Sequence, residues 1–536
     1  MMRAGPPAVL LVLLAMTGPA ILPVTGQPAG QAPQFRAFWV DSFGPGLYTP
    51  GQIEQLVADA RAANLNAIVA QVTRRADCLC NRSVMPRTEA EIDPEPFDPL
   101  QVLIERAHGA GLEVHAWINA GIMWAPDTPP RDPSHVFHAH GPGAPERERW
   151  VLTRADGALR GGGLYFFDPG HPGAADYIAG MALSVIKNYD VDGINLDYIR
   201  YPDFNPAENV PAWGYTPVSL ARFGAVTGRR DVPSPEDPEW AAWRREQITA
   251  IVRRIYLDAY AINPLVRISA DTVTYGDIGG EPGRWTRSRP YREVLQDWRA
   301  WIEEGILDLN IPMNYRRRTP GPPGQREMFE VWNAFIRDHQ YRRQTAIGTG
   351  LYLNTVDDSL VQIRGALATT AGGRGGAGWV GFSYRTPDRL VNERRRAPEY
   401  ARAELAAALT TVPWAAPLTA APPGTAASGS ILTPPFAGPV PVPPMPWKLS
   451  PTTGHLRGAA VMANGTPADQ VQVDLYDVRQ RLVASRRTTG SGWFGFVDLA
   501  PGAYRLAAAG PGGAQASASV TVVAGQVAPA ALVLGR

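Results

Sequence analysis

The sequence predicts an α/β fold: a (β/α)₈ TIM barrel, followed by a Pro-rich linker and a small all-β sandwich. Three observations favour the barrel. Short β-rich runs alternate with longer amphipathic segments eight times between residues 34 and 410. Segments that lead from a helix into a strand are short, whereas several that leave a strand are long. No G-x-G-x-x-G motif follows the first strand, which argues against an open dinucleotide-binding sheet.

The expected strands are runs of six or seven residues rich in β-branched and aromatic side chains, at 35–41, 66–72, 113–119, 192–197, 266–271, 308–314, 345–351 and 378–384. Helical spacing predicts helices at 51–63, 99–110, 173–188, 239–263, 291–304, 325–339, 357–370 and 398–409. The long connections 120–170, 198–238 and 272–290 follow strands. We therefore expect them on the face where active sites of this fold form.

The first 27 residues have the pattern of a secretory signal peptide. One early Arg is followed by the apolar run 8–16 and then by small residues. The apolar run is too short to favour a membrane-spanning helix. We expect a secreted, extracytoplasmic protein without a transmembrane span after signal removal. An uncleaved N-terminal anchor is the alternative.

Two further segments follow the barrel. Residues 411–450 are dense in Pro, Ala and Gly without periodicity, which predicts an extended linker that lies partly along the barrel. Residues 451–536 contain short strands separated by turn signals and predict a small antiparallel sandwich. This part resembles the carboxypeptidase-regulatory-like (prealbumin-like) modules at Gly458, Thr489, Gly492, Phe494, Leu499, Gly502 and Tyr504. Such a resemblance implies an accessory module.

Composition excludes several classes of function. The net charge is +1, and no basic run with interleaved aromatics occurs, so no nucleic-acid partner is expected. The only cysteines, Cys78 and Cys80, lack the remaining ligands of a structural zinc site. They form either a disulfide in an oxidising compartment or two free thiols. We expect neither a metal nor a cofactor.

Polar and aromatic side chains gather where the predicted strands end. The candidates are Trp39, Gln71, His115, Trp117, Asn119, Asp197, Arg200, Tyr201, Asp271, Asn314, Tyr315 and Tyr384. Amides and carboxylates bind hydroxyl groups, and aromatic faces stack on sugar rings. The set therefore predicts a polysaccharide ligand, although His115 is equally consistent with a hydrogen-bonded core residue.

Two carboxyl groups are the candidates for chemistry. Glycoside cleavage needs a carboxylate at the anomeric carbon and an acid for the leaving oxygen. We expect Asp197 in the first role, with Arg200 keeping it ionised, and Asp271 in the second. The alternatives are an ion pair with Arg200 that only orders the loop and, for Asp271, a helix cap or loop anchor. The rival carboxylates lie on loops: Glu89, Glu91, Asp203 and Asp277.

Six segments carry a family resemblance in the order of the chain: "FRAFWVD", "LNAIVAQV", "GLEVHAWIN", "DVDGINLDYIRYP", "WRREQITAIVRRIY" and "LDLNIPMNY". Together they resemble the bacterial glycosyl-hydrolase-like family 10 domain over about residues 35–386, most specifically at "DGINLDYIRYP". The resemblance implies a glycosidase on bacterial cell-wall glycan or another extracellular polysaccharide. The implied functional residues are Arg36, Trp39, Gln71, His115, Trp117, Asn119, Asp197, Asn314 and Tyr315.

One departure from the family keeps two functions open. Many relatives have two consecutive acids where this chain has Asp197-Tyr198, so the second catalytic carboxyl must come from elsewhere. The first hypothesis is a secreted O-glycosyl hydrolase. The second is a non-catalytic glycan-binding protein that uses the same barrel groove. An esterase or deacetylase remains a third, without a metal triad or a Ser-His-Asp order to support it.

Overall fold

The computed structural model describes residues 32–279, 283–319, 321–370, 373–415 and 431–535. The predicted signal peptide lies outside these residues. Eight parallel strands close a barrel in the order β1-β10-β9-β8-β7-β6-β3-β2. They are β1 (Phe35–Val40), β2 (Ala67–Thr73), β3 (Glu113–Asn119), β6 (Gly193–Asp197), β7 (Arg267–Val273), β8 (Leu309–Met313), β9 (Gln344–Gly350) and β10 (Gly378–Phe382). The predicted barrel is confirmed.

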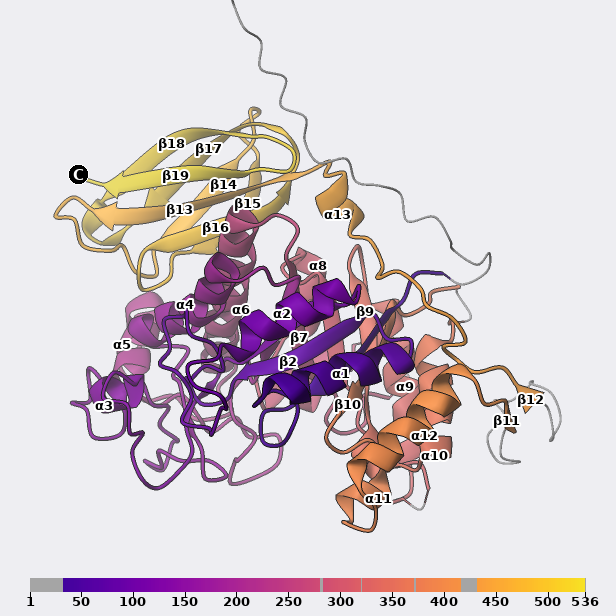
Figure 1. Ribbon diagram of the computed structural model, residues 1–536. Coiled ribbons are helices and arrows are strands. Elements are labelled where there is room, and N and C mark those ends of the chain that lie inside the picture. Colours follow the sequence, from indigo (N-terminus) through magenta and orange to yellow (C-terminus); the bar gives the residue numbers. More distant parts are fainter. Residues whose placement is uncertain (1–31, 280–282, 320, 371–372, 416–430, 536) are drawn as a thin grey trace, which may run out of the picture. The chain divides into compact units, whose positions relative to one another are not determined.

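Helices lie outside the barrel strands (Figure 1). The main ones are α1 (Pro50–Ala62), α2 (Pro99–Gly109), α4 (Pro172–Asn188), α6 (Pro238–Ile262), α8 (Trp298–Glu304), α9 (Gln325–Asp338), α10 (Val356–Leu367) and α12 (Pro398–Thr410). Four of them begin with a side-chain cap followed directly by Pro, which tolerates the first helical position because its missing N–H has no partner there. The four caps are Thr49, Asp98, His171 and Asp237.

The helix predicted at 291–304 is interrupted. The chain forms α7 (Arg289–Arg292), leaves helical geometry with Leu295 at φ 54°, and resumes as α8. The buried Gln296 side chain explains the break. Its Oε1 accepts a hydrogen bond from the Val273 N–H at 2.9 Å, and its Nε2 faces the Asp271 carbonyl oxygen at 3.4 Å. The break in the helix thus places the Gln296 side chain where its hydrogen bonds hold the carboxyl end of β7.

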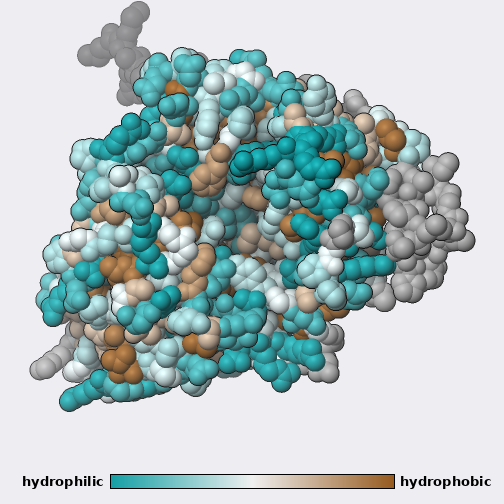
Figure 2. Space-filling model, turned by 90° about the horizontal axis from the view of Figure 1, so that it is seen from below, coloured by the Kyte–Doolittle hydropathy of each residue, from teal (hydrophilic) through white to brown (hydrophobic). Residues whose placement is uncertain are grey.

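The long loops carry short elements of their own. These are β4 (Ile122–Trp124), α3 (Val136–His140), β5 (Tyr165–Phe166), α5 (Pro217–Thr227), the 3₁₀ turns η1 (Trp285–Arg287) and η2 (Leu351–Leu353), and α11 (Arg389–Asn392). Cys78 and Cys80 form a disulfide in the loop after β2, which decides between the two expectations for this pair. Figure 2 shows a face of the molecule that is hollowed near its middle.

The Pro-rich segment 433–449, here called the strap, crosses the amino-terminal end of the barrel. Residues around the starts of β1, β2, β7 and β9 donate hydrogen bonds to strap carbonyl oxygens: Arg36 to Gly438, Asn66 to Val440, Gln34 to Pro441, Arg267 to Pro443 and Gln344 to Pro444. Val442 packs against the apolar cluster inside the barrel. Part of the predicted linker is therefore an ordered cover of the barrel base.

A buried ion pair fastens the end of the strap. Lys448, in α13 (Pro446–Leu449), binds Asp308 with 2.6 Å between Nζ and Oδ2, and both side chains are almost fully buried. Trp447 donates from Nε1 to the other carboxylate oxygen at 2.7 Å. The Ile268 N–H also donates to Asp308, at 2.8 Å. Every oxygen of this buried carboxylate is therefore satisfied.

The C-terminal region forms two facing sheets, β16-β13-β19 and β15-β14-β17-β18. The strands are β13 (Gly454–Met462), β14 (Gln472–Tyr476), β15 (Leu482–Arg487), β16 (Trp493–Leu499), β17 (Gly502–Ala509), β18 (Gln515–Val522) and β19 (Val527–Leu534). The 3₁₀ turn η3 (Pro511–Gly513) precedes β18, and β11 (Trp414–Ala415) pairs with β12 (Ile431–Leu432) in the linker. The prediction of a purely antiparallel sandwich is wrong in one respect, because β19 runs parallel to β13.

None of the helices in the described part of the chain combines the length and apolarity that crossing a membrane requires.

Candidate active site

Two carboxyl groups lie at the same level on neighbouring barrel strands. Leu196 of β6 pairs with Ala270 of β7, so Asp197 and Asp271 each follow that pair by one residue. Adjacent strands are about 4.8 Å apart. Both side chains face the barrel interior, where they bind tryptophans of the inner cluster. The fold therefore brings together the two acids that the sequence singled out.

Asp197 is held by hydrogen bonds to both of its oxygens. Trp117 Nε1 donates to Oδ2 at 3.1 Å, and the Tyr198 N–H donates to Oδ1 at 2.7 Å. The residue is 6% exposed. Burial raises the pKa of Asp197 to about 6, although the positive charge of Arg200 and the two hydrogen bonds act in the opposite direction.

Asp271 is buried more deeply, at 2% exposed. Its Oδ1 accepts hydrogen bonds from Trp39 Nε1 at 3.2 Å and from Asn195 Nδ2 at 3.0 Å. Burial, and then the neighbouring charge of Asp197, raise the pKa of Asp271 well above its usual value. Two like charges on adjacent strands disfavour ionisation of both groups, so one carboxyl holds a proton where the other is ionised.

An aromatic floor surrounds the acids. The Phe382 ring stacks on Tyr315 with centroids 5.4 Å apart and meets Trp39 and Trp117 edge-on at 6.2 and 6.3 Å. Tyr352 packs on Phe382 at 5.9 Å. Burial is the main cause that raises the pKa of Tyr315, followed by the charges of the two acids. These rings offer apolar faces around the carboxyl pair.

Arg200 does not form an ion pair with Asp197. Its guanidinium lies 3.3 Å from Asp203 Oδ1 and 4.9 Å above the Tyr198 ring. The Tyr275 hydroxyl donates to the other Asp203 oxygen at 2.9 Å. Burial alone would raise the pKa of Asp203, but Arg200 and Tyr275 outweigh it and lower that pKa. Arg200 thus acts on Asp197 through the field of its charge.

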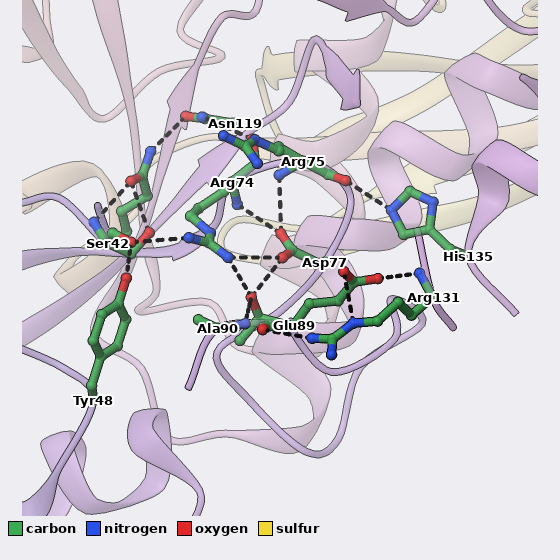
Figure 3. A network of polar contacts seen from close by, with 12 residues as sticks. Ser42, Tyr48, Arg74, Arg75, Asp77, Glu89, Ala90, Asn119, Arg131 and His135 are labelled. Atoms are coloured by element: carbon green, nitrogen blue, oxygen red, sulfur yellow. Dashed lines mark hydrogen bonds and ion pairs between the residues drawn. The ribbon is translucent and has the colours of Figure 1, made fainter. Parts of the chain in front are cut away.

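A chain of amides leads from the acids to the loop after β2. Asn119 of β3 pairs in register with Asp197, accepts a hydrogen bond from Gln71 Nε2 at 3.2 Å, and donates to the Arg74 carbonyl at 3.1 Å. Gln71 Oε1 also accepts from the Ser42 N–H at 3.0 Å. The ends of β1, β2 and β3 are tied together by these contacts, which Figure 3 shows.

Other predicted residues lie elsewhere in the barrel. Arg36 and His115 are at its amino-terminal end, where Arg36 binds the strap and His115 Nε2 lies 3.0 Å from Glu113. Asn314 points outward and donates to Asn333 of α9 at 2.9 Å. The Tyr384 hydroxyl donates to Asp59 of α1 at 2.8 Å.

Tyr201 is buried, with Arg244 of α6 5.8 Å from its ring, and is likewise not part of the acid pair. Among the rival carboxylates, Asp203 binds Arg200, Glu89 binds Arg131, and Glu91 and Asp277 are exposed. Within the described ranges, no three His, Cys, Asp or Glu side chains are grouped as ligands for a metal ion.

Sequence reasoning missed two residues at the site, Asn195 and Phe382. Strand alternation carries a signal for both. Asn195 precedes Asp197 by two residues and shares its face, and Phe382 follows the inward-facing Val380 by two. Tyr198 follows Asp197 directly and leaves strand geometry with a φ of 51°.

Comparisons with known proteins identify relatives of both parts of the chain. The family model described as "Glycosyl hydrolase-like 10" matches residues 34–364, and "Carboxypeptidase regulatory-like domain" matches residues 455–535. The glycosyl hydrolase YngK of Bacillus subtilis (strain 168) is 28% identical over 269 residues, which cover 49% of this chain and 48% of that protein. The glycosyl hydrolase DigH of Escherichia coli (strain K12) is 24% identical over 273 residues, which cover 47% of this chain and 54% of that protein. The chain thus spans about half the length of these relatives.

Among solved structures, the PgaB (BpsB) glycoside hydrolase domain from Bordetella bronchiseptica is 14% identical, with a TM-score of 0.47, and the match covers 69% of this chain and 98% of that one. Alpha-L-fucosidase isoenzyme 2 from Paenibacillus thiaminolyticus is 15% identical, with a TM-score of 0.42, and the match covers 70% of this chain and 49% of that one.

Proposed function

The chain belongs to the glycosyl hydrolase-like 10 family, and from this premise we propose that its barrel hydrolyses glycosidic bonds in bacterial cell-wall glycan or another extracellular polysaccharide. One observation supports the proposal above the others. Two carboxyl groups lie side by side at the carboxyl ends of β6 and β7, and their surroundings favour ionisation of Asp197 before Asp271. Glycoside cleavage requires such a difference in protonation between the group that acts as the acid and the group that acts in its ionised form.

The roles follow from the two protonation states. Ionised Asp197 faces the anomeric carbon and stabilises, or bonds to, the positive centre that develops as the C–O bond breaks. Protonated Asp271 gives its proton to the leaving glycosidic oxygen. Water then adds its oxygen to the anomeric carbon, and one of its protons returns to the carboxylate of Asp271. Trp39 and Trp117 hold the two acids in place through their indole N–H groups.

The expected extracytoplasmic location has one structural support. The Cys78–Cys80 disulfide belongs to the chemistry of an oxidising compartment. Together with the signal-like first 27 residues, it favours export and therefore a polysaccharide outside the cytoplasm.

The first experiment is a digestion with four proteins: wild type, Asp197→Asn, Asp271→Asn and Asp277→Asn. Each is incubated with peptidoglycan glycan strands and a panel of polysaccharides, and new reducing ends are counted. We expect release by the wild type and by Asp277→Asn, whose changed side chain is exposed. The two other variants should lose activity by about a hundredfold or more, since each lacks an acid–base group.

The outcomes separate the candidate functions. Equal activity in Asp271→Asn would show that the second acid lies elsewhere. A wild-type protein that binds glycan and never releases reducing ends would support the non-catalytic glycan-binding alternative. Loss of cleavage in Asp197→Asn with binding retained would support the hydrolase.

A further inference from the structure

Two arginines follow β2 directly, and their side chains have different surroundings. The terminal nitrogens of Arg74 contact acceptors: Nη2 donates to Thr88 Oγ1 at 2.7 Å and lies 3.4 Å from Asp77 Oδ2. Thr88 in turn donates to Asp77 at 2.6 Å (Figure 3). Asp77, the carboxylate of this loop that contacts the two arginines, therefore binds the side chains of Arg74 and Thr88.

Arg75 uses only its backbone in the network. Its N–H donates to Asp77 at 3.1 Å and its carbonyl oxygen lies 2.9 Å from His135 Nε2, whereas in Figure 3 no dashed line reaches its guanidinium. Among the residues that the structure describes, this guanidinium has neither a hydrogen-bond acceptor nor a carboxylate partner. Burial, and then the charge of Arg74, lower its pKa. An arginine stays protonated in proteins, and the nearby charge of Asp77 offsets these two effects only in part.

An exposed aromatic ring lies beside this charge. Phe43 is 49% exposed, and the guanidinium carbons of Arg74 and Arg75 each lie 5.6 Å from its ring centroid. Phe43 follows β1 and Arg75 follows β2, so both belong to the face of the barrel that carries the acids. A flat ring beside an unpaired cation is suited to a sugar that carries a negative charge.

The amide chain connects this place to the acid pair. Asn119, which pairs with Asp197, donates to the carbonyl of Arg74, the residue before Arg75. Arg75 therefore stands at the edge of the candidate active site, beyond β2 and two strands from β6 in the barrel order.

We propose that Arg75 is a specificity-determining residue that binds an anionic group on the glycan, a carboxylate or a sulfate ester, while Phe43 contacts the sugar that carries it. The guanidinium fork matches the paired oxygens of either anion. The inference rests on the proposed function in that it places a glycan in the barrel mouth. It adds a substrate class, acidic glycans, and the residue that selects it.

The test compares matched acidic and neutral glycans. Dissociation constants are measured for polygalacturonate and its carboxyl-reduced form, for peptide-free cell-wall glycan and its carboxyl-reduced form, and for dextran sulfate and dextran. The wild type should prefer the acidic member of at least one pair. Arg75→Gln should lower that preference about tenfold or more, as expected for a charge-assisted hydrogen bond. The pair that responds identifies the anion.

Two further variants control the comparison. Arg131→Gln also removes one positive charge from the network, but Arg131 is 78% exposed and its charge is paired with Glu89 at 3.3 Å, so the preference should stay within twofold. Arg75→Lys keeps the charge without the fork and should retain part of the preference. Thermal unfolding verifies that each variant is folded, which we expect because the Arg75 side chain donates no hydrogen bond to the described residues.

Three results decide the matter. An equal preference in wild type and Arg75→Gln, or no acidic preference in the wild type, overturns the assignment of Arg75. Cleavage of neutral glycans alone overturns it as well, while the glycosidase proposal stands. Acidic preference that depends on Arg75, without release of reducing ends from any glycan, supports the assignment and overturns the glycosidase proposal instead.

Discussion

At the scale of single residues, Asp271 has surroundings that suit a protonated carboxyl. Its Oδ1 accepts the hydrogen bonds of both Trp39 and Asn195, and asparagine keeps that acceptor without ionising. A carboxyl group whose pKa is higher in the folded state than in the unfolded state contributes its full stability only at pH values below the unfolded-state pKa, near 3.9. This contribution is lost as the pH rises toward the folded-state pKa. The free energy of unfolding of Asp271→Asn should therefore equal that of the wild type at pH 4. Above pH 4 the variant should become progressively more stable than the wild type, by up to about 1.4 kcal/mol per pH unit.

Thermal unfolding of both proteins from pH 4 to pH 9 measures this difference. Asp277→Asn is the control and should follow the wild type at every pH, since Asp277 is exposed. Parallel curves for Asp271→Asn and the wild type would contradict the argument.

The acid pair also predicts the pH dependence of catalysis. In the proposed mechanism Asp197 acts as the ionised group, and its pKa is raised to about 6, so kcat/KM should rise about tenfold per pH unit below that value and level off above it. At higher pH the rate should fall again as Asp271 loses its proton. Because the two groups interact, the two inflections belong to the pair. Reducing-end release from pH 4 to 10 gives the profile, and a rate that declines through pH 6 would exclude these roles.

Strand periodicity explains which site residues were predictable. Asp197 and Asp271 end apolar runs, and barrel residues at such positions point into the mouth. Asn314 and Tyr315 are consecutive, so only one of them can face inward, and it is Tyr315. The alternation along β10 does not extend to Tyr384, because the strand ends at Phe382. The charge partner of Arg200 depends on loop geometry, which the sequence pattern does not encode.

At the scale of secondary-structure elements, the strap depends on one buried ion pair. Removing one partner of such a pair leaves an uncompensated charge and costs about 3–5 kcal/mol. Lys448→Met should therefore lower the free energy of unfolding by about that amount, because Asp308 would remain buried. The double variant Lys448→Met/Asp308→Asn should lose less of the free energy of unfolding than Lys448→Met alone. Urea unfolding monitored by fluorescence measures both.

The chain offers a matched control for this experiment. Its other lysine, Lys187, is exposed at the end of α4, and Lys187→Met should change stability by no more than about 0.5 kcal/mol. Equal effects of the two lysine substitutions would mean that the strap does not stabilise the barrel.

Element prediction succeeded where periodicity is strong. All eight strands and seven of the eight helices were expected close to their observed bounds, because buried parallel strands and amphipathic helices have clear patterns. The segment 291–304 shows helical spacing, yet the tertiary hydrogen bonds of Gln296 interrupt it. The strap has no periodicity at all, and its order comes from hydrogen bonds to residues as far as about 400 positions earlier, such as Arg36 to Gly438.

At the scale of the whole molecule, the strap and the sandwich contribute separately. The sandwich binds the barrel through Arg222, whose Nη2 and Nε lie 2.6 and 2.7 Å from Asp469, and through Arg343, 2.8 Å from Asp498. A chain that ends at residue 450 keeps the strap, and we expect it to unfold cooperatively at a moderately lower temperature. A chain that ends at residue 411 loses the strap too and should lose its cooperative transition. Calorimetry distinguishes the two, and identical transitions would contradict the role of the strap.

The position of the strap has a consequence for how the protein is made. The last barrel helix, α12, ends at Thr410, yet Lys448 is the residue that neutralises Asp308 at the base. A growing chain therefore carries all eight strands and the last barrel helix for some 40 residues before its base can close, which is a few seconds at 5–20 residues per second. During that interval Asp308 lacks its cation and Val442 is not yet available to the inner cluster. Such a barrel matures only when its C-terminal segment arrives, so a nascent chain stays incomplete, and accessible to chaperones, until translation has passed the barrel itself.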